Sequence, residues 1–285
     1  MADYRDLLKW AEMQIRQSGS EVARLDAEYL MAAVLGYDSR SQIYLHRDEL
    51  SQDQKNQFEG YVERRLMHEP VAHILGKTEF WSLPFTVTKD TLIPRADSET
   101  LVAHVVEELS AQDAPYILDL GTGSGCLILS VLHELKGASG IAVDQSWGAL
   151  SVARDNAVAL ELAARVDFIE SDWFTGLAPE KHQFDCIVSN PPYIPTHDCQ
   201  QLMPDVKDYE PMTALDGGAD GLQDYRYIIR HAKDYLKPGG LLAVECGIGQ
   251  ADDIVSLFKQ GDFQKVAIRH DLPGVARVVS GRLCE

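Results

Sequence analysis

A short glycine-rich turn constrains the fold more than any other feature of this sequence. Gly121, Gly123 and Gly125 come directly after the apolar segment Tyr116–Leu120 and directly before a helical pattern at 126–135. Glycine tolerates the backbone angles of a tight turn and lets a ligand approach the backbone closely. The N-terminus of the following helix adds unpaired N–H groups and the positive end of a dipole. This order of elements predicts a ligand-binding turn in an α/β sheet.

Apolar segments typical of strands alternate with helical patterns from about residue 91 onward. The predicted strands are Tyr116–Leu120, Gly140–Asp144, Val166–Glu170, Phe184–Ser189, Gly240–Glu245, Lys265–Arg269 and Ala276–Ser280. The predicted helices between the early strands and beyond them lie at 126–135, 147–163 and 221–236. This alternation predicts an α/β fold, namely a doubly wound, mainly parallel seven-stranded sheet with helices on both faces. Ligands of such sheets bind outside the C-terminal ends of the strands.

The segment 3–75 shows the apolar spacing of helices instead. One predicted helical face consists of Leu8, Ala11 and Ile15, and a second of Val22, Leu25, Tyr29, Ala32 and Ala33. Helix ends are expected at Gly19 and Gly36. A capping box of Ser51 and Gln54 is expected to open a third helix at about 51–68, which Pro70 ends.

A change to strand-like spacing follows this helical segment. Phe80, Trp81, Leu83, Phe85 and Val87 predict a hairpin of two short strands within 78–89. We therefore expect a helical docking domain at 1–75, a β-hairpin linker at 76–90 and an α/β domain at 91–285.

The spacing of the glycines restricts which class of ligand the turn could bind. A dinucleotide fold has Gly-x-Gly-x-x-Gly, whereas this turn has Gly-x-Gly-x-Gly. Its N–H groups could instead hold a carboxylate, which methionine-derived cofactors carry. The candidate cofactor-binding residues of the turn are Gly121, Thr122, Gly123, Ser124 and Gly125. The alternative is a turn with no ligand.

Acidic residues follow the next two predicted strands. Asp144 lies 25 positions after Asp119, at a strand end, where an acidic residue is placed to bind ribose hydroxyls; the alternative is a helix cap. After the third strand, the Asp172 carboxylate could accept a hydrogen bond from an adenine amino group. The Trp173 indole could cover the face of that ring, or these two could be a surface acid and a core tryptophan.

The tetrapeptide Asn190-Pro191-Pro192-Tyr193 follows the predicted strand Phe184–Ser189. A residue before proline is biased toward an extended backbone, and the Asn190 side-chain carbonyl can accept a hydrogen bond from an NH2 group. The prolines lack N–H groups, so the carbonyl of Pro191 can serve as a second acceptor. The Tyr193 ring can pack on that NH2 group and favour a nearby sulfonium cation. Such a site suits methyl transfer to an amide or aromatic amine by positioning and electrostatic stabilisation.

Charge and sequence composition restrict partners and compartment. The chain has a net charge of -18, and the segment 76–285 carries 17 Lys and Arg against 31 Asp and Glu, which opposes direct binding of nucleic acid. No apolar run is long enough to span a membrane, and the first residues do not resemble a targeting signal. The five cysteines lack metal-site spacing, so we expect free thiols, no metal site and a cytoplasmic location.

These motifs resemble the amino-methylating class I S-adenosylmethionine-dependent methyltransferases. Flanking segments narrow the resemblance to the release-factor glutamine methyltransferase family (PrmC/HemK type). They are Glu69–Gly76, Glu79–Trp81, Leu92–Arg95, Tyr209–Pro211, Ala214–Gly218, Asp220–Leu222, Asp271–Leu272 and Arg277–Val279. One departure is Ala96, where that family usually has a second proline after Ile93-Pro94-Arg95.

The resemblance implies transfer of a methyl group from S-adenosylmethionine to the side-chain amide nitrogen of glutamine in the Gly-Gly-Gln motif of class I peptide-chain release factors. It implies that the glycine turn, Asp144, Trp173 and Asn190 contact the cofactor. It also implies that Asn190, Pro191, Pro192 and Tyr193 hold the glutamine, and that the helical domain helps to grip the release factor. The sequence leaves the roles of Arg95 and Glu99 open.

Two other classes of function stay open at this stage. Adenine-N6 methyltransferases of nucleic acids share the Asn-Pro-Pro-Tyr motif, but they need a basic recognition surface, which the charge of 76–285 opposes. A cofactor-binding adaptor without catalysis would not need an intact Asn190-Pro191-Pro192-Tyr193 motif.

Overall fold

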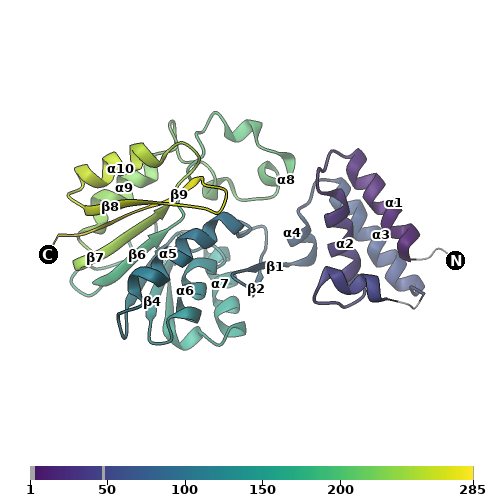
Figure 1. Ribbon diagram of the computed structural model, residues 1–285, viewed down its shortest axis with the longest axis horizontal. Coiled ribbons are helices and arrows are strands. Elements are labelled where there is room, and N and C mark those ends of the chain that lie inside the picture. The colour runs from purple at the N-terminus through teal and green to yellow at the C-terminus, as the bar shows by residue number, and fades with distance from the viewer. Residues whose placement is uncertain (1–3, 47–48, 285) are drawn as a thin grey trace. The chain divides into compact units, whose positions relative to one another are not determined.

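The computed structural model describes residues 4–46 and 49–284, which fall into two compact units (Figure 1). The smaller unit comprises Met1–Lys77 and Met203–Tyr209, and the larger comprises Thr78–Leu202 and Glu210–Glu285. The first three residues, which belong to the segment examined for a targeting signal, lie outside the described part. No described helix is both long and apolar enough to cross a membrane.

The smaller unit is helical and has its own core. Its helices are α1 (Tyr4–Gln17), α2 (Ala23–Val34), α3 (Gln52–Leu66), α4 (Val71–Leu75) and α8 (Pro204–Lys207), with a 3₁₀ helix at Arg40–Leu45. The predicted face of Leu8, Ala11 and Ile15 is buried. The predicted capping box is present, because the Ser51 hydroxyl accepts from Gln54 N and the Gln54 side chain accepts from Ser51 N.

The second predicted face is largely wrong, although Ala32 is buried as predicted. Val22 and Tyr29 are 52% and 45% exposed, and the buried face of α2 is built from Ala23, Ala27 and Leu30 instead. The helix begins only at Ala23. Its buried side is rich in alanine, which is only weakly apolar, so the sequence pattern did not show which face is buried.

The predicted end of α3 at Pro70 is also wrong. The helix ends at Leu66, and Pro70 is the N-cap of α4. His68 has a φ of 67°, in the left-handed region, and its N–H donates to Arg65 O. This turn ends α3 before the proline, which then starts the next helix from a suitable extended backbone.

The larger unit is built on the predicted seven-stranded sheet. Its strands are β3 (Tyr116–Leu120), β4 (Ser139–Asp144), β5 (Val166–Glu170), β6 (Phe184–Ser189), β7 (Leu236–Glu245), β8 (Gln264–His270) and β9 (Ala276–Arg282). The order is β5-β4-β3-β6-β7-β9-β8, parallel from β5 to β7, with β9 antiparallel to both neighbours. The order of the strands reverses between β3 and β6, which is where ligands of such sheets bind.

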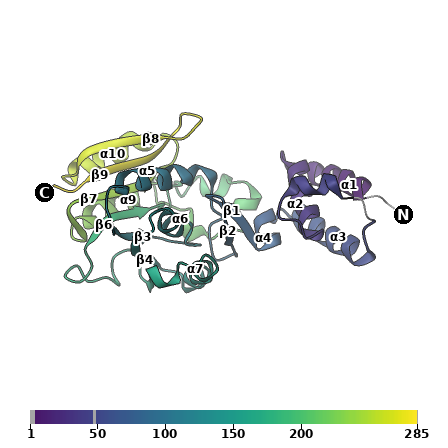
Figure 2. The same cartoon turned by 60° about the horizontal axis from the view of Figure 1, so that its bottom comes forward.

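Helices cover both faces of this sheet (Figure 2). They are α5 (Glu99–Leu109), α6 (Cys126–Glu134), α7 (Trp147–Ala159), α9 (Gln223–Ala232) and α10 (Ala251–Gln260). Alternate strand residues point to opposite faces: Leu118 and Leu242 share a buried core with α9 and α10, whereas Ile117 and Ala243 share one with α5 and α6. Helices α6, α7 and α9 were predicted from the sequence, whereas α5 and α10 were not.

The predicted hairpin is formed by β1 (Lys77–Phe80) and β2 (Leu83–Thr86). Phe80 and Phe85 are buried in the core beneath α5 and α6, so most of the hairpin is part of the larger unit. Trp81 and Ser82, with φ of 54° and 57°, make the turn. The Trp81 N–H donates to Glu99 Oε1 at 2.8 Å, and the Trp81 indole donates to Glu134 Oε1 at 2.8 Å.

Candidate active site

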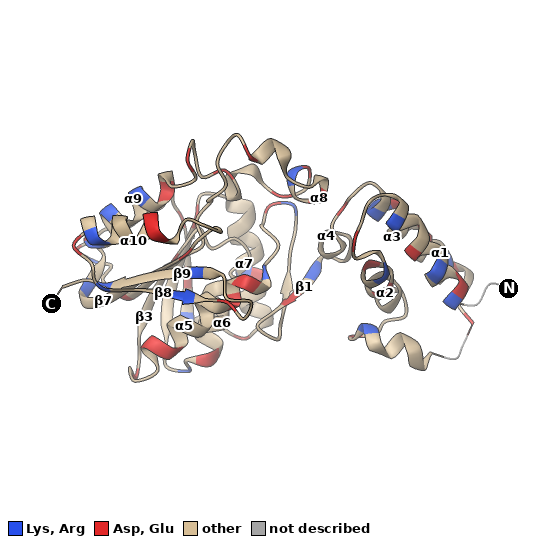
Figure 3. Ribbon diagram, turned by 45° about the horizontal axis from the view of Figure 1, so that its top comes forward, with Lys and Arg blue, Asp and Glu red and all other residues tan. Residues whose placement is uncertain are grey.

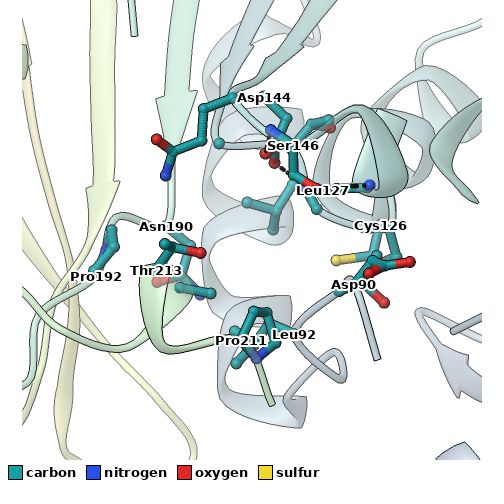
Figure 4. Close-up of a pocket in the computed structure, with 18 of the residues that line it drawn as sticks. Asp90, Leu92, Cys126, Leu127, Asp144, Ser146, Asn190, Pro192, Pro211 and Thr213 are labelled. Atoms are coloured by element: carbon teal, nitrogen blue, oxygen red, sulfur yellow. Dashed lines mark hydrogen bonds between the residues drawn. The ribbon is translucent and has the colours of Figure 1, made fainter. Parts of the chain in front are cut away.

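A cavity of about 190 Å³ lies at the C-terminal ends of the central parallel strands. The predicted site residues that line it are Gly121, Thr122, Gly123, Ser124, Asp144, Asp172, Trp173, Asn190 and Pro192. They lie at or just after the ends of β3, β4, β5 and β6, four adjacent strands, so the sheet register itself brings them together. Figure 4 shows Asn190, Pro192 and Thr213 on one side of this cavity and Asp90 and Cys126 on the other.

Three predicted residues do not line the cavity. Gly125, with a φ of 80°, is the N-cap of α6, and a Cβ there would lie 3.0 Å from Leu129 Cδ1, so its role is close packing. Pro191 is buried. Tyr193 is half-buried, and Tyr193 O accepts from Gln250 Nε2 at 2.9 Å.

The N–H groups of the glycine turn are largely used to build the turn. Those of Gly121 and Thr122 both donate to Val143 O at 2.9 Å, and that of Gly123 donates to Asp144 Oδ2 at 2.9 Å. A ligand carboxylate could take these donors only by breaking internal bonds. What the turn offers is space, because Gly123 has a φ of 55° and a Cβ there would meet nothing within 4 Å.

Asp144 links the turn to the next helix. One carboxylate oxygen accepts from Gly123 N and the other from Ser146 N, both at 2.9 Å. Burial raises the Asp144 pKa, and these backbone bonds oppose that rise. The helix cap is Ser146, whose hydroxyl accepts from Ala149 N. Each Asp144 oxygen keeps a lone pair with which it could accept a hydroxyl hydrogen bond.

The Trp173 indole forms a wall of the cavity beside the glycine turn. A Cβ on Gly121 would lie 3.5 Å from the ring, an ordinary van der Waals contact, so the requirement for glycine comes from its φ of 72°. Trp173 itself has a φ of 49°, which a bulky residue rarely adopts. Asp172 is exposed at the cavity edge.

Asn190 lies next to a buried acid that the sequence did not single out as a site residue. Ser189 on β6 pairs with Val244 on β7, so Asn190 and Glu245 are neighbours at the ends of adjacent parallel strands. Glu245 is 1% exposed, and its burial raises its pKa to about 7 even though the Ser98 hydroxyl and the Asn190 amide lower it. Asn190 Nδ2 lies 3.5 Å from Ser98 Oγ.

A second wall of the cavity comes from two segments whose roles the sequence left open. Arg95 Nη2 donates to both carboxylate oxygens of Glu210, at 2.6 and 2.8 Å, and the Glu210 side chain is 1% exposed. Arg95 and the neighbouring Pro211, Thr213 and Ala214 line the cavity. The only sequence signal for this wall was that Leu92–Arg95, Tyr209–Pro211 and Ala214–Gly218 resemble the family's segments. Glu99 does not line the cavity and instead holds the hairpin turn.

Among the described residues, no group of three or more His, Cys, Asp or Glu side chains is arranged to hold a metal ion. Cys126 lines the cavity, but burial raises its pKa to about 12. Its thiol is therefore protonated at neutral pH and is not a nucleophile.

Comparison with known proteins agrees with this arrangement. The family models of the PrmC N-terminal domain and the methyltransferase small domain match residues 6–76 and 96–206. A release factor glutamine methyltransferase from Geobacter sulfurreducens is 42% identical over 280 residues, which cover 98% of this chain and 96% of that protein. The chain belongs to the release factor glutamine methyltransferase family.

Other relatives extend this similarity. The release factor glutamine methyltransferase of Francisella tularensis is 42% identical over 260 residues, which cover 90% of each chain. Among solved structures, a 16S rRNA methyltransferase from T. thermophilus (RsmC), in complex with AdoMet and guanosine, has a TM-score of 0.51 at 18% identity. The match covers 73% of this chain and 49% of that one, and it shows a shared class I methyltransferase fold.

Proposed function

We propose that this protein transfers a methyl group from S-adenosylmethionine to the side-chain amide nitrogen of the glutamine in the Gly-Gly-Gln motif of class I release factors. Membership of the family supports the reaction. The observation that carries it in the structure is the place of Asn190-Pro191-Pro192. This tripeptide begins where β6 ends, beside the glycine turn that follows β3, at the point where the strand order reverses.

The residues that line the cavity support binding of such a cofactor. We assign cofactor binding to the lining residues Gly121, Thr122, Gly123, Ser124, Asp144, Asp172, Trp173 and Asn190, whereas Gly125 shapes the turn that carries them. The open space over Gly123 admits a ligand near the backbone, and Asp144 offers acceptors at the end of β4. The Trp173 indole offers a flat apolar surface. When bound, S-adenosylmethionine supplies an electrophilic methyl group attached to a positively charged sulfur.

The substrate side of the site supplies acceptors rather than a base. We assign glutamine binding to Asn190 and Pro192, which line the cavity, and propose that the adjoining Pro191 and Tyr193, which do not line it, contribute a backbone carbonyl and a ring face. The Asn190 Oδ1 and the Pro191 carbonyl can each accept one proton of the glutamine NH2 group and so orient its nitrogen. Burial raises the pKa of Tyr193 to about 12, so its phenol keeps its proton at neutral pH. The amide nitrogen becomes positively charged as it takes the methyl group and then releases its proton to water, so a strong base is not needed.

Transfer of labelled methyl to a recombinant release factor tests this proposal. We expect the wild-type release factor to be labelled and its variant with Ala in place of the Gly-Gly-Gln glutamine to stay unlabelled. Equal labelling of both release factors would contradict the proposed acceptor atom.

We propose release factors as the partners, a cytoplasmic location, and no direct contact with nucleic acid. Helices α9 and α10 each begin with acidic residues and carry basic residues farther along (Figure 3), so neither of these two described helices has a continuous cationic stripe. The adenine-N6 alternative would need such a stripe for a phosphate backbone. Labelling of adenine in DNA, with none of the release factor, would favour that alternative.

A further inference from the structure

The orientation of the Asn190 side-chain amide decides whether the site can work. The two ends of a carboxamide have nearly the same shape, but Oδ1 accepts hydrogen bonds and Nδ2 donates them. Only the orientation with Oδ1 toward the substrate can hold a glutamine NH2 group. With the amide turned over, two NH2 groups would face each other. Something must therefore favour one orientation.

The residues on the other side of Asn190 supply that preference. Ser189 pairs with Val244, so the next residues, Asn190 and Glu245, are also at matched positions. In a parallel sheet, residues at matched positions point to the same face. Ser98 lies on this face, immediately before α5, and its hydroxyl is 3.5 Å from Asn190 Nδ2. Above its pKa of about 7, Glu245 is a carboxylate and therefore an acceptor only, so it attracts the Nδ2 end and repels Oδ1.

Glu245 is well placed for this role and poorly placed for direct chemistry. The residue is 1% exposed and is not among the described residues that line the cavity, whereas Asn190 and Ser98 are. Its Oε2 is buried without a hydrogen-bond partner among the described residues. A buried carboxyl with an unused oxygen costs stability, which argues that it is kept for a function.

The surroundings of Glu245 keep its carboxyl in place. The Glu245 backbone carbonyl accepts from the Tyr225 hydroxyl at 2.8 Å, and the residue pairs with Val278 on β9. Arg277, which precedes Val278 on β9, lowers the Glu245 pKa by its charge. Its guanidinium is itself held by the Asp97 and Asp271 carboxylates, at 2.5 and 3.0 Å. The Glu245 backbone is therefore fixed by Tyr225 and β9, and its carboxyl lies near Ser98, Asn190 and Arg277.

We propose that Glu245, together with Ser98, is a positioning residue that binds the Nδ2 end of Asn190 and so presents Asn190 Oδ1 to the substrate nitrogen. This inference rests on the proposed function for its kinetic test, but the orientation of the amide can also be observed without turnover. Glu245 does not touch the reacting atoms in this account.

The first test is kinetic and uses Glu245→Gln, which keeps the shape of the side chain. A neutral carboxamide can accept from Nδ2 or donate to Oδ1, so it no longer selects one orientation. At a pH of about 8.5, above the Glu245 pKa of about 7, we expect kcat to fall roughly 10-fold to 100-fold, the effect of losing one charge-assisted hydrogen bond. The KM for the release factor and the affinity for S-adenosylmethionine should change by less than about threefold, because binding groups are retained.

Glu108→Gln is the matched control. Glu108 lies on α5 and pairs with Arg282, another arginine of β9, at 2.6 Å, and it does not line the active-site cavity. This variant should have wild-type kinetics. If Glu245→Gln keeps kcat within about threefold of wild type while wild type methylates the release factor, the positioning role is refuted. A loss caused by weaker cofactor binding or a lower Tm, with unchanged kcat at saturation, would also refute it.

The second test is spectroscopic and needs no substrate. In protein labelled with ¹⁵N-asparagine, the Asn190 side-chain NH2 signal is identified by its loss in Asn190→Ala. At a pH of about 8.5, its protons should be shifted downfield and exchange slowly in wild type, because they face a buried, ionised Glu245. In Glu245→Gln the signal should move upfield and exchange faster. An identical signal in both proteins would overturn the inference, even if wild type were inactive on release factors and the proposed function had failed.

Discussion

At the scale of single residues, the site depends on one acceptor. Asn190, which directly follows β6, lines the cavity, and its side-chain oxygen can accept a hydrogen bond from a substrate NH2 group. Asn190→Ala removes this acceptor and leaves the glycine turn and Asp144 in place. We expect methyl transfer to fall at least roughly 100-fold, as on loss of other preorganised polar groups. Calorimetry should show that S-adenosylmethionine still binds. Near-normal turnover of this variant would rule out the acceptor role.

Asp144 belongs to the cofactor side of the same cavity. Asp144→Ala should weaken binding of S-adenosylmethionine roughly 10-fold to 100-fold, because it removes a charged acceptor and also leaves the Gly123 and Ser146 N–H groups without their partner. Asp144→Asn, which keeps one acceptor oxygen, should lose less. Titration calorimetry of the two variants measures this difference, and an unchanged affinity in Asp144→Ala would count against ribose binding.

At the scale of elements, the hairpin between β1 and β2 is held by the start of α5. Glu99 Oε1 accepts from Trp81 N, where the backbone makes a turn with two positive φ angles. Glu99→Ala should lower the free energy of unfolding by about 1–2 kcal/mol, because a half-buried N–H loses its partner. Glu99→Gln keeps an acceptor and should lose much less. Urea denaturation provides the measurement, and equal losses in both variants would contradict this role.

Strand β3 carries a buried acid that makes stability depend on pH. Burial raises the Asp119 pKa from an ordinary value of 3.8 to about 7, although Thr122 Oγ1 donates to it at 2.7 Å and opposes the rise. The native state thus keeps a proton that the unfolded chain releases above about pH 4. The resulting stabilisation is complete below that pH and is lost as the pH rises through about 7.

Asp119→Asn removes this titration. The free energy of unfolding of the variant, measured by urea denaturation between pH 4 and 7, should change less with pH than that of wild type. Between pH 4 and 7, wild type should lose more free energy of unfolding than the variant, by roughly 1.4 kcal/mol for each pKa unit by which folding raises the Asp119 pKa. A variant with the same pH profile as wild type would show that Asp119 is not protonated in the native state.

At the scale of the whole molecule, the larger unit was largely predictable from sequence. Strands β3, β5 and β6 have the predicted bounds, because buried parallel strands are short apolar runs bounded by polar residues and glycine. The residues at their ends could be assigned to one cavity, because parallel strands end at the same edge of the sheet.

Other features could not be predicted because they depend on contacts distant in sequence. Glu245 reads as the last residue of an apolar strand, and only the register of β6 and β7 brings it beside Asn190. The pairing of Arg95 with Glu210 spans 115 positions, and the face of α2 was misjudged because its buried side is largely alanine. The hydrogen bonds of the glycine turn also depend on the fold, because its N–H groups donate to Val143 O on the neighbouring strand β4.

The most direct measurement is to locate the transferred methyl group. After reaction of the purified protein with S-adenosylmethionine and a class I release factor, fragmentation mass spectrometry of the Gly-Gly-Gln peptide reads the position of the added mass. The account predicts a single methyl group on the glutamine side chain, formed by wild type and Glu108→Gln and lost with Asn190→Ala. A methyl group on any other residue of the release factor, or none, would contradict it.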